Sequence, residues 1–412
     1  MSMEEWKEYK LGEVCVKIGS GATPKGGKEA YLGGDISLIR SQNVLDFAFS
    51  NDGLAYINEE QADKLKNVEV KENDVLLNIT GDSVARACIV PQFVLPARVN
   101  QHVAIIRGDE SLVLNKFILY LLQYKKGHLL SISQGGATRN ALTKKMIENF
   151  EISLPSLPTQ QKIANILSSL DDKIEVNRRI NEQLEELAGA LFKSWFVDFE
   201  PFKDGEFVDS ELGMIPKGWK VGTLSEILYI SKDSVNPSKM PNCIFHHYSI
   251  PAYDNGKREE TQEGNTILSN KFKIDNKTTL FSKLNPRIKR VWFVDDVEDN
   301  SICSTEFIPY KAKDKDLVYF VNSVLSSDYF YNKIMSIVNG ATGSHQRFHP
   351  KDTLNFIFAY DMEVAKEYNN IVKPIITKIL NNQQEIHHLT TLRDTLLPKL
   401  MSGEIDVNEV KI

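Results

Sequence analysis

Several features that would indicate a metal, a disulfide framework or a membrane are scarce in this chain. Only four cysteines occur among its 412 residues, and none forms a Cys-x-x-Cys pair. Their scatter argues against zinc and against disulfides, and reduced thiols in a reducing compartment are the simplest account. No apolar run reaches the length of about 18 residues that a membrane helix needs, and residues 1–10 lack the apolar stretch of a signal peptide. We therefore expect a cytoplasmic protein that does not contact a membrane.

A net positive charge is also absent. The formal net charge is −6, whereas a clearly basic domain is the usual footprint of nucleic-acid binding. Two segments depart from this balance, because residues 279–294 and residues 135–147 carry lysine and arginine but no acidic residue. Each segment is either an ordinary solvated face or a surface for an acidic partner. The charge pattern alone leaves both interpretations open.

The motifs of catalysis are missing as well. The string nearest to the DPPY or NPPF tetrapeptide of adenine methyltransferases is residues 284–287, LNPR, which has arginine in place of the second proline. Residues 19–29 lack the first glycine and the magnesium-binding hydroxyl of a P-loop. Two histidine pairs consist of adjacent residues, which do not share a helix face for a metal: His246-His247 and His387-His388. We expect no catalysis, no metal and no cofactor in this chain.

The longest regular pattern covers residues 158–200. From Ile163 onward, apolar residues and two asparagines step by four and three positions, which is the seam of a coiled coil. Asn177 and Asn181 lie in the middle of this seam, where side-chain amides cost stability but fix the register of two helices. Such a helix is about 60 Å long. A core helix of an ordinary domain, the competing interpretation, rarely runs this far, so the pattern predicts a rod with a partner helix.

A second seam of the same kind covers residues 368–400. When Ile174 is aligned with Ile379, the leucines of the two seams coincide at one constant shift. Pro374 interrupts the second pattern near its beginning, so we expect a kink or a late start there. The predicted seam residues are Ile163, Leu167, Leu170, Ile174, Asn177, Asn181, Leu184 and Leu191, with Val372, Ile375, Ile379, Asn382, Ile386, Leu389, Leu396 and Leu400.

The residues in front of each rod repeat too. The first half contains strand-like runs separated by Gly, Asp, Asn and Pro, followed by a helical pattern over residues 115–130. At nearly the same shift as the rods, residues 74–81 align with 278–285, and the tripeptide GAT recurs at 136–138 and 340–342. The four strand-like runs are residues 35–40, 74–81, 86–91 and 101–108.

Together these patterns predict an α+β protein made by internal duplication. Each copy is a globule of α/β type with short mixed strands, followed by a long helix. The second helix can bury its seam only by running antiparallel to the first, which predicts a coiled-coil spacer with a globule at each end and an approximate pseudo-two-fold axis. Two unlike heads at a set separation suit a bipartite linear target such as DNA. The expected segments are the first globule at 1–157, the first helix at 158–200, a linker and the second globule at 201–361, the second helix at 362–402 and a tail at 403–412.

Four stretches at the junctions of globules and rods are distinctive as a set: residues 135–164, 191–202, 212–227 and 389–405. In this order and at this spacing they make the chain resemble the specificity subunits of type I restriction-modification enzymes. The resemblance covers essentially the full length. It implies two target recognition domains, each reading a few base pairs of an asymmetric, split site in double-stranded DNA.

The resemblance also implies partners that carry the chemistry. The two rods would set the gap between the half-sites and dock two DNA adenine methyltransferase subunits. ATP-dependent restriction subunits, which translocate DNA and cut it, join in the full assembly of the family. S-adenosylmethionine, ATP and magnesium would belong to those partners, and this chain would have no catalysis of its own.

Polar loops flanking the strands are the candidate DNA contacts. Arginine with glutamine or asparagine reads guanine and adenine edges, whereas lysine more often binds phosphate. For each single residue, a solvated surface loop is the competing interpretation, and the family resemblance does not fix base-reading positions because its recognition domains diverge. The candidates are Arg40, Ser41, Gln42, Asn43, Asn78, Thr80, Arg86, Arg139, Asn140, Lys144 and Lys145 in the first globule, and Ser282, Lys283, Asn285, Arg287, Lys289, Arg290, Gln346 and Arg347 in the second.

A protein of a different class would fit the same pattern of rods and globules. A non-catalytic coiled-coil scaffold with two protein-binding heads would show no dependence on DNA and no methyltransferase partner. Copurification separates this alternative from the DNA-reading one.

Overall fold

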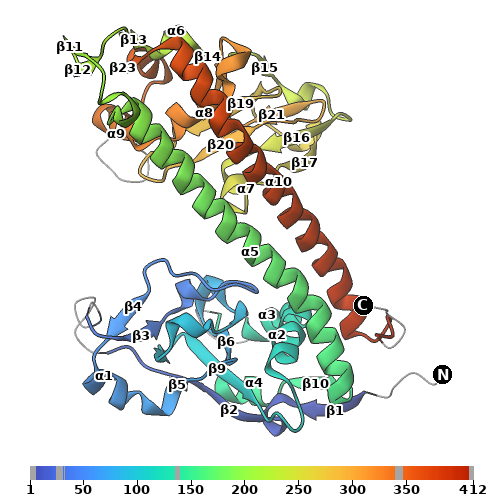
Figure 1. The fold of residues 1–412 in the computed structure, drawn as a ribbon. Helices are drawn as coiled ribbons and strands as arrows, with labels where there is room; N and C mark the ends of the chain where they lie inside the picture. The colour runs from blue at the N-terminus through green and yellow to red at the C-terminus, as the bar shows by residue number, and fades with distance from the viewer. Residues whose placement is uncertain (1–5, 25–30, 32, 135–139, 339–346, 408–412) are drawn as a thin grey trace. The chain divides into compact units, whose positions relative to one another are not determined.

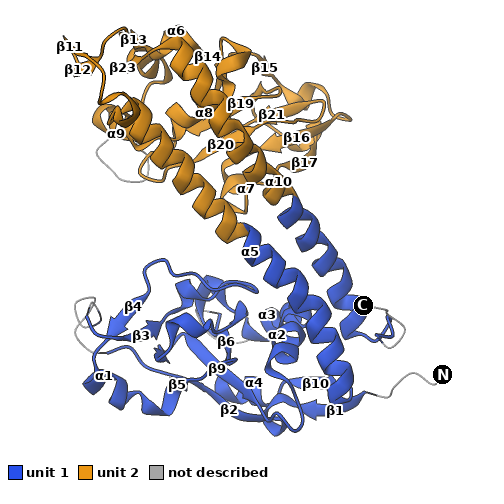
Figure 2. Ribbon diagram, viewed as in Figure 1, with its two compact units in different colours: residues 1–177, 385–412 blue, residues 178–384 orange. Residues whose placement is uncertain are grey.

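A computed structural model describes residues 6–24, 31, 33–134, 140–338 and 347–407 (Figure 1). The chain divides into two compact units (Figure 2): unit 1 consists of residues 1–177 and 385–412, and unit 2 of residues 178–384. The boundary crosses both long helices, α5 (Leu157–Phe196) and α10 (Met362–Met401). Each unit therefore contains one globule together with part of each helix.

Among its described residues, unit 1 has two four-stranded sheets and a two-stranded one. The first sheet, in the order β2–β9–β6–β7, is antiparallel, and the second, β4–β3–β8–β5, contains the parallel pair β3 and β8. The strands are β1 (Lys7–Lys10), β2 (Cys15–Ser20), β3 (Ile36–Ile39), β4 (Ala55–Ile57), β5 (Glu69–Val70), β6 (Val75–Asn78), β7 (Ala87–Ile89), β8 (Ala97–Val99), β9 (Val103–Gly108) and β10 (Glu151–Leu154), which pairs with β1. The shorter helices are α1 (Glu59–Lys64), α2 (Asn115–Tyr124), α3 (Lys126–Ser133) and α4 (Lys144–Glu148).

The first sheet of unit 1 is buried on both faces, which explains why its strands read as continuous apolar runs. Along β6, Val75 and Leu77 pack into one core and Leu76 into another. The first core also takes in α2, the beginning of α5 and the end of α10, and the second lies against the other four-stranded sheet. The four strand-like runs of the first half are confirmed as β3, β6, β7 and β9. The helix expected over residues 115–130 is divided at Lys125 into α2 and α3.

Unit 2 repeats this strand order. Its four-stranded antiparallel sheet is β14–β22–β19–β20, its mixed sheet is β15–β18–β21–β16–β17 with β16 parallel to β21, and β13 pairs with β23 as β1 pairs with β10. The strands are β11 (Phe207–Ser210), β12 (Gly213–Pro216), β13 (Lys220–Thr223), β14 (Leu228–Ile230), β15 (Ser234–Val235), β16 (Ile244–Tyr248), β17 (Glu260–Glu263), β18 (Lys271–Lys273), β19 (Thr278–Ser282), β20 (Val291–Val294), β21 (Ser301–Cys303), β22 (Phe307–Ala312) and β23 (Ile357–Tyr360). The shorter helices are α6 (Leu224–Ile227), α7 (Ile250–Asp254), α8 (Val318–Ser326) and α9 (Asp328–Ile337).

The two long helices run antiparallel within each unit. In unit 1, Arg393 pairs with Asp171 and Glu385 accepts a hydrogen bond from Asn177, so later residues of one helix meet earlier residues of the other. In unit 2, the amide of Asn382 donates to Oδ1 of Asn181 at 2.8 Å, and Asn181 donates to the Ile379 carbonyl at 3.2 Å. All sixteen predicted seam residues are buried or half-buried. The apolar periodicity thus marked the covered face of each helix.

The expectation of a late start at Pro374 is wrong. Helix α10 begins at Met362 and continues through the proline. A proline inside a helix leaves the carbonyl four residues earlier without its donor. Both Asn370 and Pro374 are exposed, so water can take the place of the missing donor.

Candidate nucleic-acid interface

In unit 1, the loops at one edge of the first sheet are joined by backbone hydrogen bonds. The Ile79 amide, just after β6, donates to the His102 carbonyl, just before β9, at 3.0 Å. The Gly21 amide donates to Asn100 at 3.0 Å, and the Gly81 amide donates to Asn140 at 3.1 Å. We call the joined segments the loop edge of unit 1: residues 21–23, 40–43, 79–86, 100–102 and 140–142.

The turn at residues 40–43 is fastened to this edge by Asn78. Its side-chain amide donates to the Ser41 carbonyl at 2.9 Å and to the Val44 carbonyl at 3.2 Å. Asn43 closes the turn by accepting from the Arg40 amide at 3.0 Å and donating to the Ser50 carbonyl at 2.9 Å. The described sequence candidates from Arg40 to Arg86, together with Asn140, are therefore brought together at one place, with α4 and its Lys144 and Lys145 directly after it.

Two of those candidates need correction. Asn43 and Asn78 were expected to contact DNA, but both side chains are 0% exposed. Their amides are occupied by loop carbonyls and hold the turn in shape. Neither side chain can reach a base from this position, so their role is to position Ser41 and Gln42, which are half-buried and exposed.

A chain of polar side chains crosses the same edge. The hydroxyl of Thr80 lies 2.6 Å from Nδ1 of His102, and Nε2 of His102 lies 3.1 Å from the side-chain nitrogen of Gln101. The Gln101 oxygen in turn accepts from the hydroxyl of Thr23. Since an amide nitrogen can only donate, Nε2 of His102 is the acceptor and Nδ1 carries the proton. The hydrogen of the Thr80 hydroxyl remains available to a further acceptor.

Unit 2 has an equivalent edge. The Lys283 amide, just after β19, donates to the Glu306 carbonyl, just before β22, at 2.9 Å, and the Ser282 amide donates to Arg290 at 3.0 Å. Arg347 reaches the same place, because its Nη2 donates to Oε1 of Glu306 at 2.9 Å. We call residues 283–290, 304–306 and 347 the loop edge of unit 2.

Two of the candidates in unit 2 also need correction. The guanidinium of Arg290 is buried and forms two hydrogen bonds of 2.7 and 2.8 Å to the carboxylate of Asp254 on α7. Ser282 is 1% exposed, and its hydroxyl bonds with the backbone of Leu284. These side chains close the loop and do not present themselves to a ligand.

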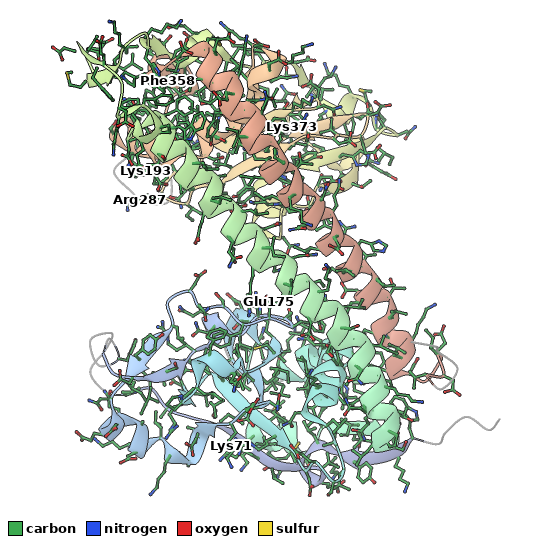
Figure 3. The ribbon with its side chains drawn as sticks, viewed as in Figure 1. Lys71, Glu175, Lys193, Arg287, Phe358 and Lys373 are labelled. Carbon is green, nitrogen blue, oxygen red and sulfur yellow. The ribbon has the colours of Figure 1, made fainter. Side chains whose placement is uncertain are left out.

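The loop that Arg290 closes presents Arg287. A turn forms where the Ile288 amide donates to the Asn285 carbonyl at 3.0 Å, with Asn285 in the left-handed region at a φ of 47°. Tyr331 on α9 donates to the Arg287 carbonyl at 3.0 Å. The Arg287 side chain is exposed at the surface of unit 2 (Figure 3).

The cations of the two edges divide into paired and unpaired ones. Lys289 lies 3.1 Å from Asp328, and Lys144 lies 3.5 Å from Glu148. Within the described part of the chain, Arg40 makes no ion pair but donates to the Gly53 carbonyl, and four other cations make neither an ion pair nor a side-chain hydrogen bond: Arg86, Lys145, Lys283 and Arg287. These four are free to neutralise phosphates. Arg139 and Gln346 lie outside the described residues.

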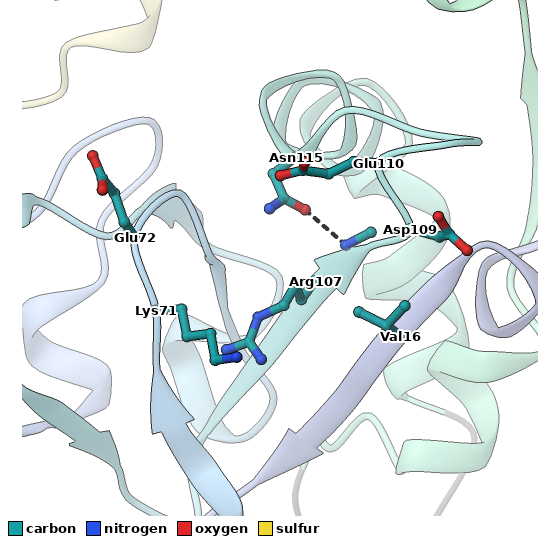
Figure 4. A pocket seen from close by; sticks show the side chains of 8 residues that line it. Val16, Lys71, Glu72, Arg107, Asp109, Glu110 and Asn115 are labelled. Carbon is teal, nitrogen blue, oxygen red and sulfur yellow. Dashed lines mark hydrogen bonds between the residues drawn. The ribbon is translucent and has the colours of Figure 1, made fainter.

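A separate hollow in unit 1, of about 310 Å³, lies at the other end of β9 (Figure 4). It is lined by Lys71, Arg107 and Asn115 among others. Arg107 is already neutralised, because both oxygens of Asp74 accept from its guanidinium at 2.6 and 2.7 Å. The guanidinium of Arg107 is therefore not free to bind a phosphate, and the hollow lies at the end of β9 away from the loop edge.

Sequence reasoning missed His102, Gln101 and Glu306. Residues 99–106 align with residues 303–310 at the same shift as residues 74–81 with 278–285, which places His102 and Glu306 at one position, directly before a buried strand. This shared position directly before a strand is the sequence signal for His102 and Glu306, because a residue there lies next to the loops at that edge of the sheet.

The described residues offer neither a metal site nor a membrane span. No three or more His, Cys, Asp or Glu side chains among them lie close enough together to hold a metal ion. No helix in the described ranges is both long and apolar enough to cross a bilayer.

Comparison with known proteins finds similarity to type I restriction enzyme specificity subunits. The Type I restriction modification DNA specificity domain matches residues 3–186. The MjaIX specificity subunit of Methanocaldococcus jannaschii, a type I restriction enzyme subunit, is 29% identical over 432 residues, covering 99% of this chain and 95% of that protein. The chain is therefore similar, over nearly its whole length, to a specificity subunit of a type I restriction enzyme.

Two further proteins that are similar to this chain are also specificity subunits. The HindI specificity subunit of Haemophilus influenzae is 30% identical over 207 residues, which is 49% of this chain and 43% of that one. The crystal structure of the type I restriction-modification S subunit of M. genitalium has a TM-score of 0.58, with 15% identity over 97% of both chains. That similarity concerns the fold of a specificity subunit.

Proposed function

We propose that this chain is a type I specificity subunit that reads a bipartite, asymmetric DNA site, with the loop edge of each unit reading one half. One observation carries the proposal: both units build the same sheet order, yet their corresponding loop edges present different side chains. A shared scaffold with unlike loops is what two recognition domains with different targets require. The unpaired cations at both edges supply contacts to phosphate.

We further propose that α5 and α10 form a spacer between the half-sites and a platform for two DNA adenine methyltransferase subunits. The antiparallel contacts within each unit support the first part. For the second part, the helices carry apolar side chains that neither unit covers: Val176 and Leu187 on α5, and Ile371 and Leu392 on α10. Exposed apolar residues on a rod are suited to a protein partner.

We propose that the chain has no catalytic activity of its own. S-adenosylmethionine would be bound by the methyltransferase subunits, and ATP and magnesium by restriction subunits where those join the assembly. The methyl-transfer motifs absent from this sequence would then be supplied by the partners.

The acidic balance of the chain predicts weak binding in isolation. Each phosphate contact adds about one to the slope of affinity against salt, and the four unpaired cations allow only a slope of a few charges. Gel-shift titration of the isolated chain at physiological salt is therefore expected to show weak binding. Nanomolar, sequence-selective binding by the chain alone would contradict this.

The proposal is tested by expressing the chain with its methyltransferase subunit in a host without adenine methylation and sequencing the genome for N6-methyladenine. The expected result is one split motif with a fixed gap, and no methylation when either protein is omitted. A chain that leaves DNA unmethylated, and copurifies with other proteins in place of a methyltransferase, would instead be a scaffold.

A further inference from the structure

His102 stands in a tightly bonded turn at the head of β9. The side-chain oxygen of Asn100 accepts from the His102 amide at 2.9 Å, and the His102 carbonyl accepts from Ile79 at 3.0 Å. The turn is tied to the second sheet, because the Asn100 amide donates to the Ile39 carbonyl at 3.0 Å.

Glu306 stands in the same turn at the head of β22. The hydroxyl of Ser304 accepts from the Glu306 amide at 3.2 Å, and the Glu306 carbonyl accepts from Lys283 at 2.9 Å. Here too the turn is tied to the mixed sheet, since the Ser304 amide donates to the Tyr248 carbonyl at 3.0 Å. Strand register agrees: Asn78 pairs with Val103, and Ser282 pairs with Phe307. Residues 102 and 306 therefore occupy one structural position in two copies of the fold.

The chemistry at this position differs completely between the copies. In unit 1, the His102 ring bonds with the Thr80 hydroxyl through Nδ1 and with the Gln101 amide through Nε2. In unit 2, Glu306 is a carboxylate that can only accept. A protein that needs two different half-sites from one scaffold needs unlike groups at matching positions.

One oxygen of Glu306 has no partner. Oε1 accepts from Arg347, whereas Oε2 accepts no hydrogen bond from the described residues. Unlike Asn43 and Asn78, the Glu306 side chain is 26% exposed, so a ligand can approach it. A buried acceptor that is left unpaired costs about 1–3 kcal/mol, which a donor from a ligand would recover. In the major groove, the donors that a base edge offers to a carboxylate are the exocyclic amino groups of cytosine and adenine.

We propose that residues 102 and 306 are equivalent specificity-determining positions. Glu306 accepts a hydrogen bond from an exocyclic amino group in the half-site read by unit 2. His102 fixes the orientation of Gln101 and Thr80, which contact the half-site read by unit 1. This inference rests on the proposed function and deepens it by assigning one position in each half-site to a named residue.

The test uses the complex of the full chain with its methyltransferase subunit and compares methylated motifs. In Glu306→Gln the side chain keeps its size but gains a donor, so discrimination at one base of the unit 2 half-site falls about tenfold to a hundredfold. The other half-site and the gap stay unchanged. His102→Glu changes only the half-site read by unit 1 and leaves the half-site read by unit 2 unchanged. Glu298→Gln, at an exposed carboxylate of the same unit, serves as the matched control and leaves the motif intact.

Arg347→Ala provides a second test of the same assignment, for the case that Glu306→Gln lowers the melting temperature of the complex. Arg347 is an exposed side chain that orients Glu306. Arg347→Ala should therefore lower discrimination at the same base of the unit 2 half-site and at no other base. Unchanged half-sites in both Glu306→Gln and Arg347→Ala, or a change at a different base in Arg347→Ala, would overturn the assignment while leaving the proposed function standing. Failure of the unmodified complex to methylate any split motif would instead refute the proposed function itself.

Discussion

The guanidinium of Arg393, near the end of α10, lies over the ring of Phe47, with 3.8 Å between the guanidinium carbon and the ring centroid. The same guanidinium donates to Asp171 of α5 at 2.8 Å, and Asp171 also accepts from the hydroxyl of Tyr120 at 2.7 Å. Phe47 belongs to the segment that follows the turn at residues 40–43. One side chain from α10 thus connects α5 with the segment that follows the turn at residues 40–43 in the same unit.

Removing this guanidinium should destabilise unit 1. In Arg393→Ala, the carboxylate of Asp171 is left buried without its cation, which costs about 3–5 kcal/mol of unfolding free energy. Asp394→Ala is the matched control, since Asp394 is exposed and its loss should cost less than about 1 kcal/mol. Urea unfolding of both variants checks this, and equal loss in the two would contradict a special role for Arg393.

The cost of Arg393→Ala should depend on pH. Burial raises the pKa of Asp171, and Arg393 opposes that rise, so the variant has a still higher pKa. A raised pKa means that the folded state binds the proton more tightly than the unfolded state, and stability is lost as pH rises through the folded pKa. The difference between wild type and variant is therefore expected to shrink as pH is lowered toward the pKa of an unfolded aspartate, about 4.

The hydrogen-bonded pair of Asn181 and Asn382 should fix the register of α5 against α10 more than it raises the free energy of unfolding. In Asn382→Ala, Oδ1 of Asn181 loses its donor inside a buried contact, so unfolding free energy falls by about 1–3 kcal/mol. Replacing both residues by leucine removes both polar groups together and is expected to leave stability equal to or above wild type. Asn381→Ala on the exposed face is the control. A double variant less stable than Asn382→Ala would be evidence against this account.

His247 makes unit 2 sensitive to mild acid. Burial lowers the pKa of His247 below the ordinary value of 6.5. Nδ1 lies 3.0 Å from the Gln262 oxygen, and Nε2 is buried with no partner among the described residues. A lowered pKa gives a contribution to stability that is complete above pH 6.5 and is lost as pH falls through the folded pKa. His247→Gln should flatten this part of the profile of melting temperature between pH 7.5 and 5, and an unchanged profile would show that other groups cause it.

Arg287 should contribute to affinity for DNA without contributing to specificity. Its exposed guanidinium has no ion pair among the described residues, so Arg287→Ala should weaken binding equally for all sequences and lower the salt slope of the assembled complex by about one. Lys313→Ala, an exposed cation just beyond the opposite end of β22, is the control. A changed base preference in Arg287→Ala would make it a base-reading residue.

Periodicity predicted the large features of this fold, because a repeated pattern averages over many residues. The two long helices, the strands of the first sheet and the repetition of the globules all left such patterns. Loop side chains leave none. Asn43, Asn78 and Arg290 have the residue types of DNA contacts, but each is used inside the protein, and the Asp254 that neutralises Arg290 is remote in sequence. Which polar loop residues turn inward is decided by tertiary contacts that a single sequence does not display.

The most direct test of the central claim, that α5 and α10 set the gap between two unlike half-sites, is a change in helix length. Seven residues that continue the seam are inserted into α5 between Asn177 and Arg178 and into α10 between Gln384 and Glu385, where the units divide. One heptad lengthens a helix by about 10 Å, on the order of three base-pair rises. Sequencing of N6-methyladenine should then show a longer gap between two half-sites whose bases are unchanged. Altered half-site bases, or an unaltered gap, would contradict the account.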